Sequence, residues 1–195
     1  MKKLTRQIHL MALALAAMAL VCMCTGQAFA QLTPQEQTEI QEAVAAGDTT
    51  AVEAVLKKLM KQAMADGKDI ETFARQAVSA AVLAAVAEGQ DSAAIAQAAS
   101  YGATSGAVEA AVEMGQPVFA AAEAASFGAR TGAVQAAQQT GQDVAAIEQA
   151  SLQGSQQSKD EARDLELFEP APEFDYEPDP EEPMTQDEQD PSPAA

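Results

Sequence analysis

The chain contains no tryptophan, and it has only two cysteines and one histidine among its 195 residues. Cys22, Cys24 and His9 all lie before residue 31. We predict that residues 1–30 are a signal peptide, so the chain that remains after its removal has no thiol and no imidazole. Its stability must then come from packing, because disulfides are excluded. Catalysis by a thiolate or an imidazole, and zinc sites built from these ligands, are excluded for the same reason.

The first thirty residues have the three parts of a secretory signal. Three basic side chains occur in the first six residues, and the apolar stretch 10–24 carries no charge. Ala28-Phe29-Ala30 has the small-x-small form that signal peptidase accepts. We therefore expect an exported protein that begins at Gln31 and is located in the periplasm, at the cell surface or in the extracellular medium.

Two alternatives to cleavage by signal peptidase are less consistent with the sequence. An uncleaved membrane anchor needs an apolar run of about 20 residues, and stretch 10–24 is shorter than that. A lipoprotein signal needs a small residue before the modified cysteine, whereas Val21 and Met23 precede Cys22 and Cys24. We expect neither a membrane anchor nor a lipid anchor.

Basic residues are scarce. After residue 30 the chain has eight Lys and Arg against 29 Asp and Glu, a net charge of −21. Nucleic acids and anionic membrane surfaces are disfavoured as partners, because both require clustered positive charge. A basic protein partner or a divalent cation is compatible with this charge, although an acidic balance often serves solubility alone.

Much of the negative charge lies in the stretch 159–195. Fourteen acidic residues, two basic residues and seven prolines fall within it, which predicts a disordered acidic tail. The motif EPAPEFDYEPDPEEP contains aromatic residues that could anchor the tail to a basic, grooved partner, and we take Phe168, Phe174 and Tyr176 as candidate partner-binding residues. A purely solubilising tail and weak calcium binding are the alternatives, and no EF-hand loop supports calcium.

Alanine and regularly spaced glycine dominate the stretch between the two ends. One series of glycines recurs every thirteen residues: Gly89, Gly102, Gly115, Gly128, Gly141 and Gly154. Two more glycines, Gly106 and Gly132, are separated by twice that interval, so the full repeat unit has 26 residues. Alanine favours helices and glycine often follows a helix C-terminus. We predict that each thirteen-residue half is a short helix plus a turn, and that residues 31–158 form an all-α domain of antiparallel hairpins stacked as a small α-solenoid or an irregular bundle.

Several positions predict where helices begin. Thr33-x-x-Glu36 is a capping box before a helix that starts at Pro34, a second helix covers 50–65, and a longer one covers 70–88. Asp91, Ser105, Thr131 and Asp143 stand where N-caps are expected, and Pro117 fits a first helical turn.

Large apolar side chains are sparse among the alanines, so helices must approach closely to bury enough surface. The candidate inward-facing anchors are Val82, Val86, Ile95, Tyr101, Val108, Val112, Phe119, Phe127, Val134 and Ile147. Tyr101 and Phe127 occupy equivalent repeat positions, for which core packing is favoured and an exposed binding platform is the alternative. The third equivalent residue is Gln153, which indicates that the array ends there.

No pattern of residues predicts catalysis or a cofactor. The glycines match neither a phosphate-binding loop nor a dinucleotide fingerprint. The carboxylate pairs Glu109–Glu113 and Glu36–Glu39 are typical of solvated helix faces. The basic cluster Lys57, Lys58 and Lys61 is interpreted as a solvated face, with docking of an acidic partner or of the chain's own tail as the alternative. We expect no catalytic, metal or cofactor site.

The sequence predicts an exported, non-enzymatic helical-repeat protein that acts as a protein-interaction or scaffold module and can self-associate. Its tail is a candidate for recruiting a basic partner. The alternative is a subunit of a secreted fibre or extracellular matrix, similar to a functional amyloid, although the shortage of β-branched and aromatic residues disfavours it. A transmembrane bundle is disfavoured, because the longest uncharged apolar run, 77–87, is too short to span a bilayer.

Overall fold

The computed structural model describes residues 32–164, and this part of the chain is all-helical. Its helices are α2 (Pro34–Ala45), α3 (Thr49–Ala65), α4 (Ile70–Glu88), α5 (Ser92–Met114), α6 (Val118–Thr140) and α7 (Val144–Asp164). The predicted signal peptide lies outside the described residues. So do the tail candidates Phe168, Phe174 and Tyr176.

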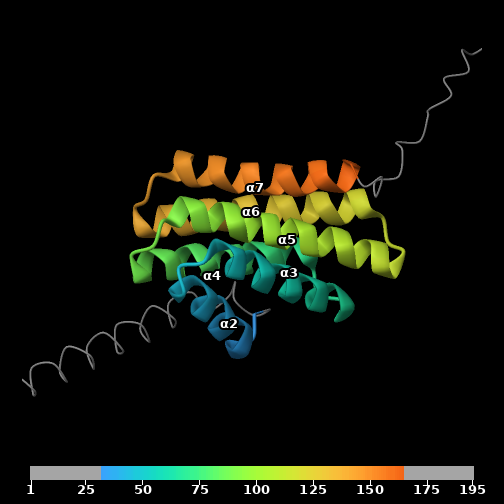
Figure 1. The fold of residues 1–195 in the computed structure, drawn as a ribbon, viewed down its shortest axis with the longest axis horizontal. Helices are drawn as coiled ribbons and strands as arrows, with labels where there is room; N and C mark the ends of the chain where they lie inside the picture. The colour runs from blue at the N-terminus through green and yellow to red at the C-terminus, as the bar shows by residue number, and fades with distance from the viewer. Residues whose placement is uncertain (1–31, 165–195) are drawn as a thin grey trace, which may run out of the picture.

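The helices pack in two layers, because each contacts the helix two places before it in the chain. Helices α3, α5 and α7 form one layer, and α2, α4 and α6 form the other. Successive helices are antiparallel, so the turns that connect them alternate between the left and right sides of the bundle in Figure 1. The stack begins with α2 at the bottom of Figure 1 and ends with α7 at the top.

The predicted starts of the first three helices are confirmed. Thr33 and Glu36 form the expected capping box: the Glu36 N–H donates to Thr33 Oγ1 at 3.2 Å, and the Thr33 N–H donates to Glu36 Oε2 at 2.5 Å. Helix α3 begins at Thr49, one residue before the expected start. Helix α4 runs from Ile70 to Glu88, as predicted.

The prediction of thirteen-residue helices is wrong. Helices α5 and α6 have 23 residues each and α7 has 21, and they continue through Gly102, Gly128 and Gly154. One 26-residue unit is therefore a single long helix plus a turn, and an antiparallel hairpin requires two units. A glycine inside a helix costs only about 1 kcal/mol relative to alanine, and packing of both helix faces offsets that cost.

The glycines fall into two structural classes. Gly89, Gly115 and Gly141 end α4, α5 and α6 with φ values of 68°, 62° and 68°, the left-handed conformation that glycine adopts without strain. At these three positions the prediction that a repeat glycine ends a helix is confirmed. The remaining repeat glycines are buried inside helices, where their lack of a side chain serves helix–helix contact.

Each buried glycine faces a backbone carbonyl of the helix two places earlier. A Cβ atom added there would lie far inside van der Waals contact with the carbonyl oxygen; the pairs are Gly102 with Glu53, Gly106 with Lys57, Gly128 with Glu71, Gly132 with Arg75, and Gly154 with Gln97. The spacing of four residues between the two glycines of α5, and between those of α6, puts both on one face. Neighbouring helices in a layer thus approach until their backbones touch.

Two predicted N-caps are confirmed and two are wrong. Asp91 accepts hydrogen bonds from Ala93 and Ala94, and Asp143 caps α7 in the same way. Ser105 lies inside α5 and Thr131 inside α6, because these helices do not stop at the glycines before them. Pro117 is the N-cap of α6, one residue before the predicted first turn.

The predicted core anchors divide into three groups. Val82, Ile95, Val108 and Ile147 are buried. Val86, Tyr101 and Val134 are half-buried. Val112, Phe119 and Phe127 are 44%, 56% and 55% exposed, so their assignment to the core is wrong. These three positions were expected in the core because they are large apolar residues among alanines, and their exposure shows that residue type alone does not decide burial.

The core changes character along the stack. Its largest fully buried side chains are concentrated in α2, α3 and the start of α4, and include Phe73, Ile40, Leu56, Leu59 and Met60. Farther along, the buried residues are mostly alanine, glycine and hydroxyl-bearing side chains. Between α5 and α7, Ser100 Oγ and Ser151 Oγ lie 2.7 Å apart in a buried hydrogen bond. The small polar side chains of this interface can therefore be buried because they hydrogen-bond to one another.

Helix α4 is long and apolar enough to cross a membrane by length and composition. Half of its apolar window is buried inside the bundle, where α4 contacts α2, α3, α5 and α6. A central core helix satisfies the same test of length and composition, and the contacts on several sides of α4 identify it as such a helix.

Candidate interaction surface

The layered packing leaves one face of α6 without a covering helix. Gly128 and Gly132 of α6 pack over Glu71 and Arg75 of α4, and Gly154 of α7 packs over Gln97 and Tyr101 of α5. The residues of α6 that lie 26 positions after Gln97 and Tyr101 are Glu123 and Phe127. Among the described residues, no helix follows α7 to cover this face.

Tyr101 and Phe127 show what the missing helix changes. Tyr101 is half-buried beneath α7, and its hydroxyl donates to Glu161 Oε2 of α7 at 2.5 Å. Phe127 occupies the equivalent position in α6 and is 55% exposed. The same repeat position is thus an interhelical contact in α5 and an exposed aromatic ring in α6.

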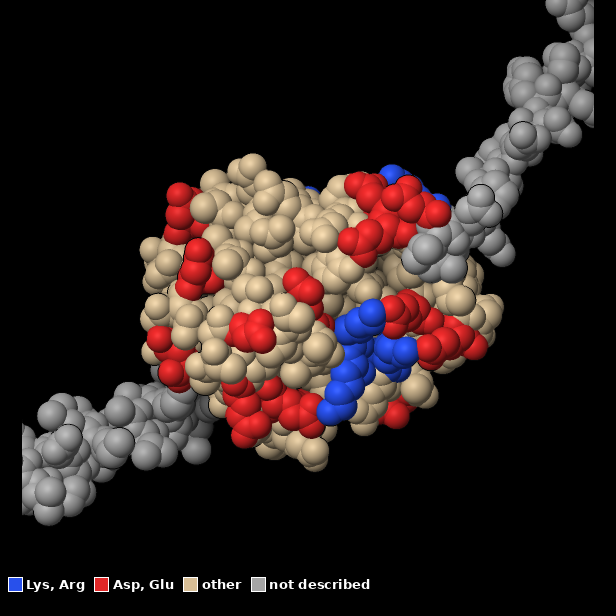
Figure 2. Space-filling model, in the orientation of Figure 1, with Lys and Arg blue, Asp and Glu red and all other residues tan. Residues whose placement is uncertain are grey.

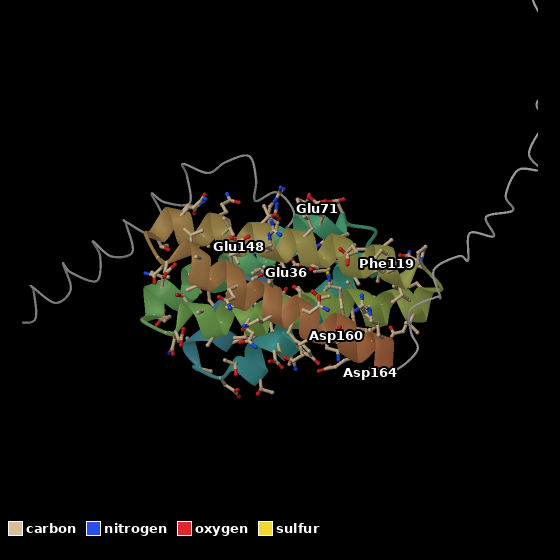
Figure 3. All side chains as sticks on the ribbon, turned by 90° about the horizontal axis from the view of Figure 1, so that it is seen from above. Glu36, Glu71, Phe119, Glu148, Asp160 and Asp164 are labelled. Atoms are coloured by element: carbon tan, nitrogen blue, oxygen red, sulfur yellow. The ribbon has the colours of Figure 1, made fainter. Side chains whose placement is uncertain are left out.

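Other side chains extend this exposed face over α6 and α7. Phe119 lies two turns before Phe127 on α6 and is 56% exposed, and Leu152 of α7 is 42% exposed. We call Phe119, Glu123, Phe127, Arg130 and Leu152 the open-end surface. Figure 3 looks onto this end of the stack, with α6 and α7 side by side.

Two ion pairs join α6 to α7 at this surface. Lys159 Nζ lies 2.9 Å from Glu123 Oε1, and Arg130 Nε lies 3.3 Å from Glu148 Oε1. Because each charge has a partner, the surface itself is close to neutral. Phe127 and Leu152 lie between these pairs along their helices, whereas Phe119 lies one turn before Glu123 on α6.

Helix α7 presents a more polar outer face than α6. Gln149, Gln153, Gln156 and Asp160 are all exposed there. Gln153, which replaces the aromatic residue of the earlier repeats, is therefore solvated as a terminal position requires. The aromatic part of the open-end surface is confined to α6.

Tyr101 has a structural role at the edge of this region. The hydrogen bond to Glu161, together with burial and the nearby carboxylates of Glu53 and Glu109, raises the pKa of Tyr101 to about 12. The phenol therefore stays protonated at all physiological pH values. It serves as a hydrogen-bond donor that holds the last turn of α7 onto α5.

The lysine cluster of α3 is paired with carboxylates of neighbouring helices. Lys57 contacts Glu109, Lys61 Nζ lies 2.6 Å from Glu113 Oε1, and Lys58 Nζ lies 2.8 Å from a carboxylate oxygen of α2. Figure 2 shows the blue lysine and arginine atoms of this face bordered by red carboxylates. The hydrogen bond to Glu113 raises the pKa of Lys61. Because acids of the same fold neutralise it, the cluster gives little support to docking of an acidic partner.

Negative charge gathers at the C-terminal end of α7. Asp160, Glu161 and Asp164 are exposed in its last turn or next to it, and Arg163 is the basic residue there. Arg163 Nη1 lies 3.2 Å from Asp160 Oδ1 and offsets part of this charge, as is expected at the C-terminal end of a helix, which favours cations. Figure 3 places Asp160, Asp164 and Phe119 toward the same end of the molecule.

Within 32–164, no group of three or more His, Cys, Asp or Glu side chains is placed to hold a metal ion. Glu109 and Glu113 are engaged by lysines of α3. Sequence reasoning favoured the core for Phe119 and Phe127 and kept an exposed binding platform as the alternative for Phe127, so it did not identify the open-end surface as a whole. The residue that could have predicted this surface is Gln153. It marks the last repeat unit, and the helix of the preceding unit is therefore left without a helix over its outer face.

Comparison of the chain with protein-family models, with curated proteins and with solved structures gave no match in any of the three.

Proposed function

We propose that this protein is a non-enzymatic binding protein, exported from the cytoplasm, whose helical repeat domain presents the open-end surface to a protein partner. The observation that supports this most strongly is Phe127, which is 55% exposed at the repeat position where its equivalent Tyr101 is covered by another helix. Exposed aromatic residues grouped with an aliphatic one are typical of interaction sites.

The acidic tail is a second part of the proposal. We retain Phe168, Phe174 and Tyr176, which follow α7 in the sequence, as candidate contacts for a partner. The distribution of charge supports a basic partner, because residues 32–164 carry a net charge of −10 and residues 165–195 add eleven acids and no base. A fibre subunit gains no support, since residues 32–164 contain no strand from which a cross-β core could form.

A capture experiment with paired variants tests this function. The bait is the full chain, the prey is the native envelope fraction or culture fluid, and the test variant carries Phe127→Ser with Leu152→Ser. The matched control carries Val112→Ser with Met114→Ser, because these residues are 44% and 39% exposed but lie at the end of α5. We expect the test variant to lose the captured protein and the control to keep it, with equal helicity by circular dichroism.

The result can also contradict the proposal. If both variants retain the same captured proteins at equal yield, the open-end surface is not the binding site. If the control loses them as well, exposed apolar surface in general is responsible and the specific assignment fails.

A further inference from the structure

The open end of the stack exposes a helix position that lies over α6 and beside α7. Helix α6 packs on α4 in its own layer and against both α5 and α7 in the other layer. The next helix of its layer would therefore lie on α6 and against α7. Within residues 32–164 no helix fills this position, and Phe127 is 55% exposed there. A helix placed on α6 would continue the interface that α6 already forms with α4.

The outer stripe of α7 has the chemistry that fits this position. Leu152 is 42% exposed, and the exposed residues around it, Gln149, Gln153 and Gln156, are uncharged. These residues are spaced so that they share one face of the helix. The α7 helix of a second copy of the chain can therefore lie over α6 with an aliphatic side chain toward Phe127 and amide groups around it.

Phe127 and Leu152 lie at nearly the same level along their antiparallel helices. The Arg130–Glu148 ion pair fixes which residues of α6 and α7 are level with each other. Phe127 is three residues before Arg130, and Leu152 is four residues after Glu148. At about 1.5 Å per residue, the two side chains are level to within roughly one helical turn. A two-fold rotation about an axis parallel to the helices keeps these levels and exchanges the two layers, so it places Leu152 of each chain over Phe127 of the other.

The open end carries little uncompensated charge. The two ion pairs between α6 and α7 lie within one chain, and residues 149–158 of α7 carry no charge. Two open ends can therefore meet along this stretch without bringing unpaired like charges into contact, although residues 32–164 have a net charge of −10. A strongly charged partner of either sign would find no matching opposite charge at this surface.

The open end is also large enough for a stable dimer. Helices of 23 and 21 residues are about 30–35 Å long and about 10 Å wide, so the two together present roughly 600–700 Å². Each chain of a stable complex contributes about 600–1,000 Å².

The opposite end of the stack offers no such surface. Gln35, Gln41 and Glu42 of α2 are exposed, and all the exposed large apolar side chains of residues 32–164 lie in α5, α6 and α7. Contact between an open end and the opposite end of another copy would extend into a filament, whereas contact between two open ends closes on itself. The distribution of apolar side chains therefore favours the closed arrangement.

Resting on the proposed function, we infer that the partner of the open-end surface is a second copy of this chain. Two chains meet at their open ends around a two-fold axis parallel to α6 and α7. The α7 helix of each chain continues the α6 layer of the other, so the two stacks join into one. Phe127 contacts the partner's Leu152, and the two-fold axis repeats this contact once.

Opposite charges at the two positions test this pairing. Phe127→Glu and Leu152→Lys each introduce a charge into both apolar contacts of the corresponding homodimer. A mixed dimer of the two variants instead has one contact between opposite charges and one original Phe–Leu contact. The chain is purified after export with residues 165–195 retained. Sedimentation velocity measures the dissociation constants, native mass spectrometry separates mixed dimers from homodimers, and circular dichroism compares helicity.

We expect the unmodified chain to dimerise at micromolar concentration and each variant alone to raise the dissociation constant at least about tenfold. Mixing the two variants should lower it again by at least about tenfold, whereas mixing Phe127→Glu with Leu152→Glu should not. The control Val112→Glu, at an exposed position at the end of α5, should leave it within about twofold. Added salt should strengthen the dimer, because it screens the repulsion between two acidic chains.

Several results would overturn the inference. They are a chain that stays monomeric at every concentration, a dimer unaffected by Phe127→Glu or by Leu152→Lys, and the absence of any gain in the mixed pair. Recovery on mixing Phe127→Glu with Phe127→Lys would also overturn it, because that result places the two Phe127 rings against each other.

A tryptophan reporter provides a measurement that introduces no charge. Because the chain has no tryptophan, Phe127→Trp introduces a single one at the surface. Its emission should shift to shorter wavelength as the protein concentration rises through the dissociation constant of the dimer. Constant emission while dimers form would show that the chains associate elsewhere, and the inference would be wrong.

These outcomes are separable from those of the proposed function. If the purified chain stays monomeric but capture of a different protein depends on Phe127 and Leu152, the open-end surface stands as a binding site and the second-copy inference is wrong. If the mixed pair dimerises as expected but the captured proteins are not this chain and are insensitive to Phe127→Ser with Leu152→Ser, the dimer stands and the proposed function fails.

Discussion

At the scale of single residues, glycine decides how closely the helices approach. A glycine inside a helix allows a neighbouring backbone to contact the Cα atom, and every buried repeat glycine faces a carbonyl of another helix. Contacts between Cα–H groups and carbonyl oxygens favour such close packing, although each contributes little. The main gain is dispersion and burial along the whole helix length, which compensates for the small size of alanine.

Substitution of Gly154 tests this close approach. Gly154→Ala should destabilise the fold by about 1–3 kcal/mol, because the new methyl group meets the Gln97 carbonyl and α7 must move away from α5. The higher helix propensity of alanine recovers about 1 kcal/mol at most. Urea unfolding followed by circular dichroism measures the change in the free energy of unfolding.

The matched control for this substitution is Ser158→Ala. Ser158 lies four residues after Gly154, is buried, and differs from alanine by one oxygen, so its replacement should change stability by less than about 1 kcal/mol. Unchanged or increased stability of the Gly154→Ala protein would show that α5 and α7 are not held at backbone contact.

At the scale of helices, α2 is attached differently from the others. It has no buried glycine. Part of its attachment to the bundle comes from Glu36, whose side chain caps α2 and also accepts a hydrogen bond from Lys68 Nζ at 2.9 Å. Lys68 precedes α4 and lies over the ring of Phe73, with Nζ 4.8 Å from the ring centroid. Glu36 thus links the start of the chain's first described helix to the start of α4.

This link should depend on pH. Burial raises the pKa of Glu36, but hydrogen bonds from Thr33 and Lys68 lower it by more, so its pKa in the folded protein is below the ordinary value of 4.5. A carboxyl group with a lowered pKa contributes stability above its unfolded value, and that contribution is lost as the pH falls through the folded value. Glu36→Gln should therefore destabilise the protein at pH 7 by about 1 kcal/mol and have little effect near pH 3.

Thermal unfolding from pH 3 to pH 7 measures this dependence, with Glu39→Gln as the matched control. Glu39 is on the same helix and pairs with Lys58, but this pair is more exposed to solvent. A difference between the wild-type protein and Glu36→Gln that stayed constant down to pH 3 would contradict the assigned role of the carboxylate.

At the scale of the whole molecule, the helical part of the chain ends later than the composition indicates. The acidic stretch was expected to begin at residue 159, yet α7 continues to Asp164. Within these six residues, Lys159 pairs with Glu123 of α6, and Glu161 accepts the hydrogen bond of Tyr101. The last turns of α7 therefore belong to the fold, and they hold both layers together at its open end.

Two truncations distinguish the fold from the segment that follows it. Removal of residues 165–195 should leave the midpoint of thermal unfolding within about 3 °C of that of the full chain. Removal of residues 159–195 should lower it by more than about 4 °C, because the Lys159 and Glu161 contacts are lost together with buried Ala162. Differential scanning calorimetry measures both midpoints, and equal effects of the two truncations would place the boundary of the fold elsewhere.

The sequence by itself determined the helical class, the capping of α2, and the ends of α4, α5 and α6. These features depend on local interactions. Alanine favours the helix, the Thr33 and Asp91 side chains accept hydrogen bonds from nearby backbone amides, and glycine adopts a left-handed φ without strain. Tertiary structure decided what local propensity leaves open. Gly102 and Gly89 have the same spacing in the repeat, but one is inside a helix and the other ends one, because only the first has a neighbouring backbone against which a bare Cα can pack. The exposure of Phe127 was decided in the same way, since burial of a repeat position depends on whether another helix lies over it and not on the residue itself.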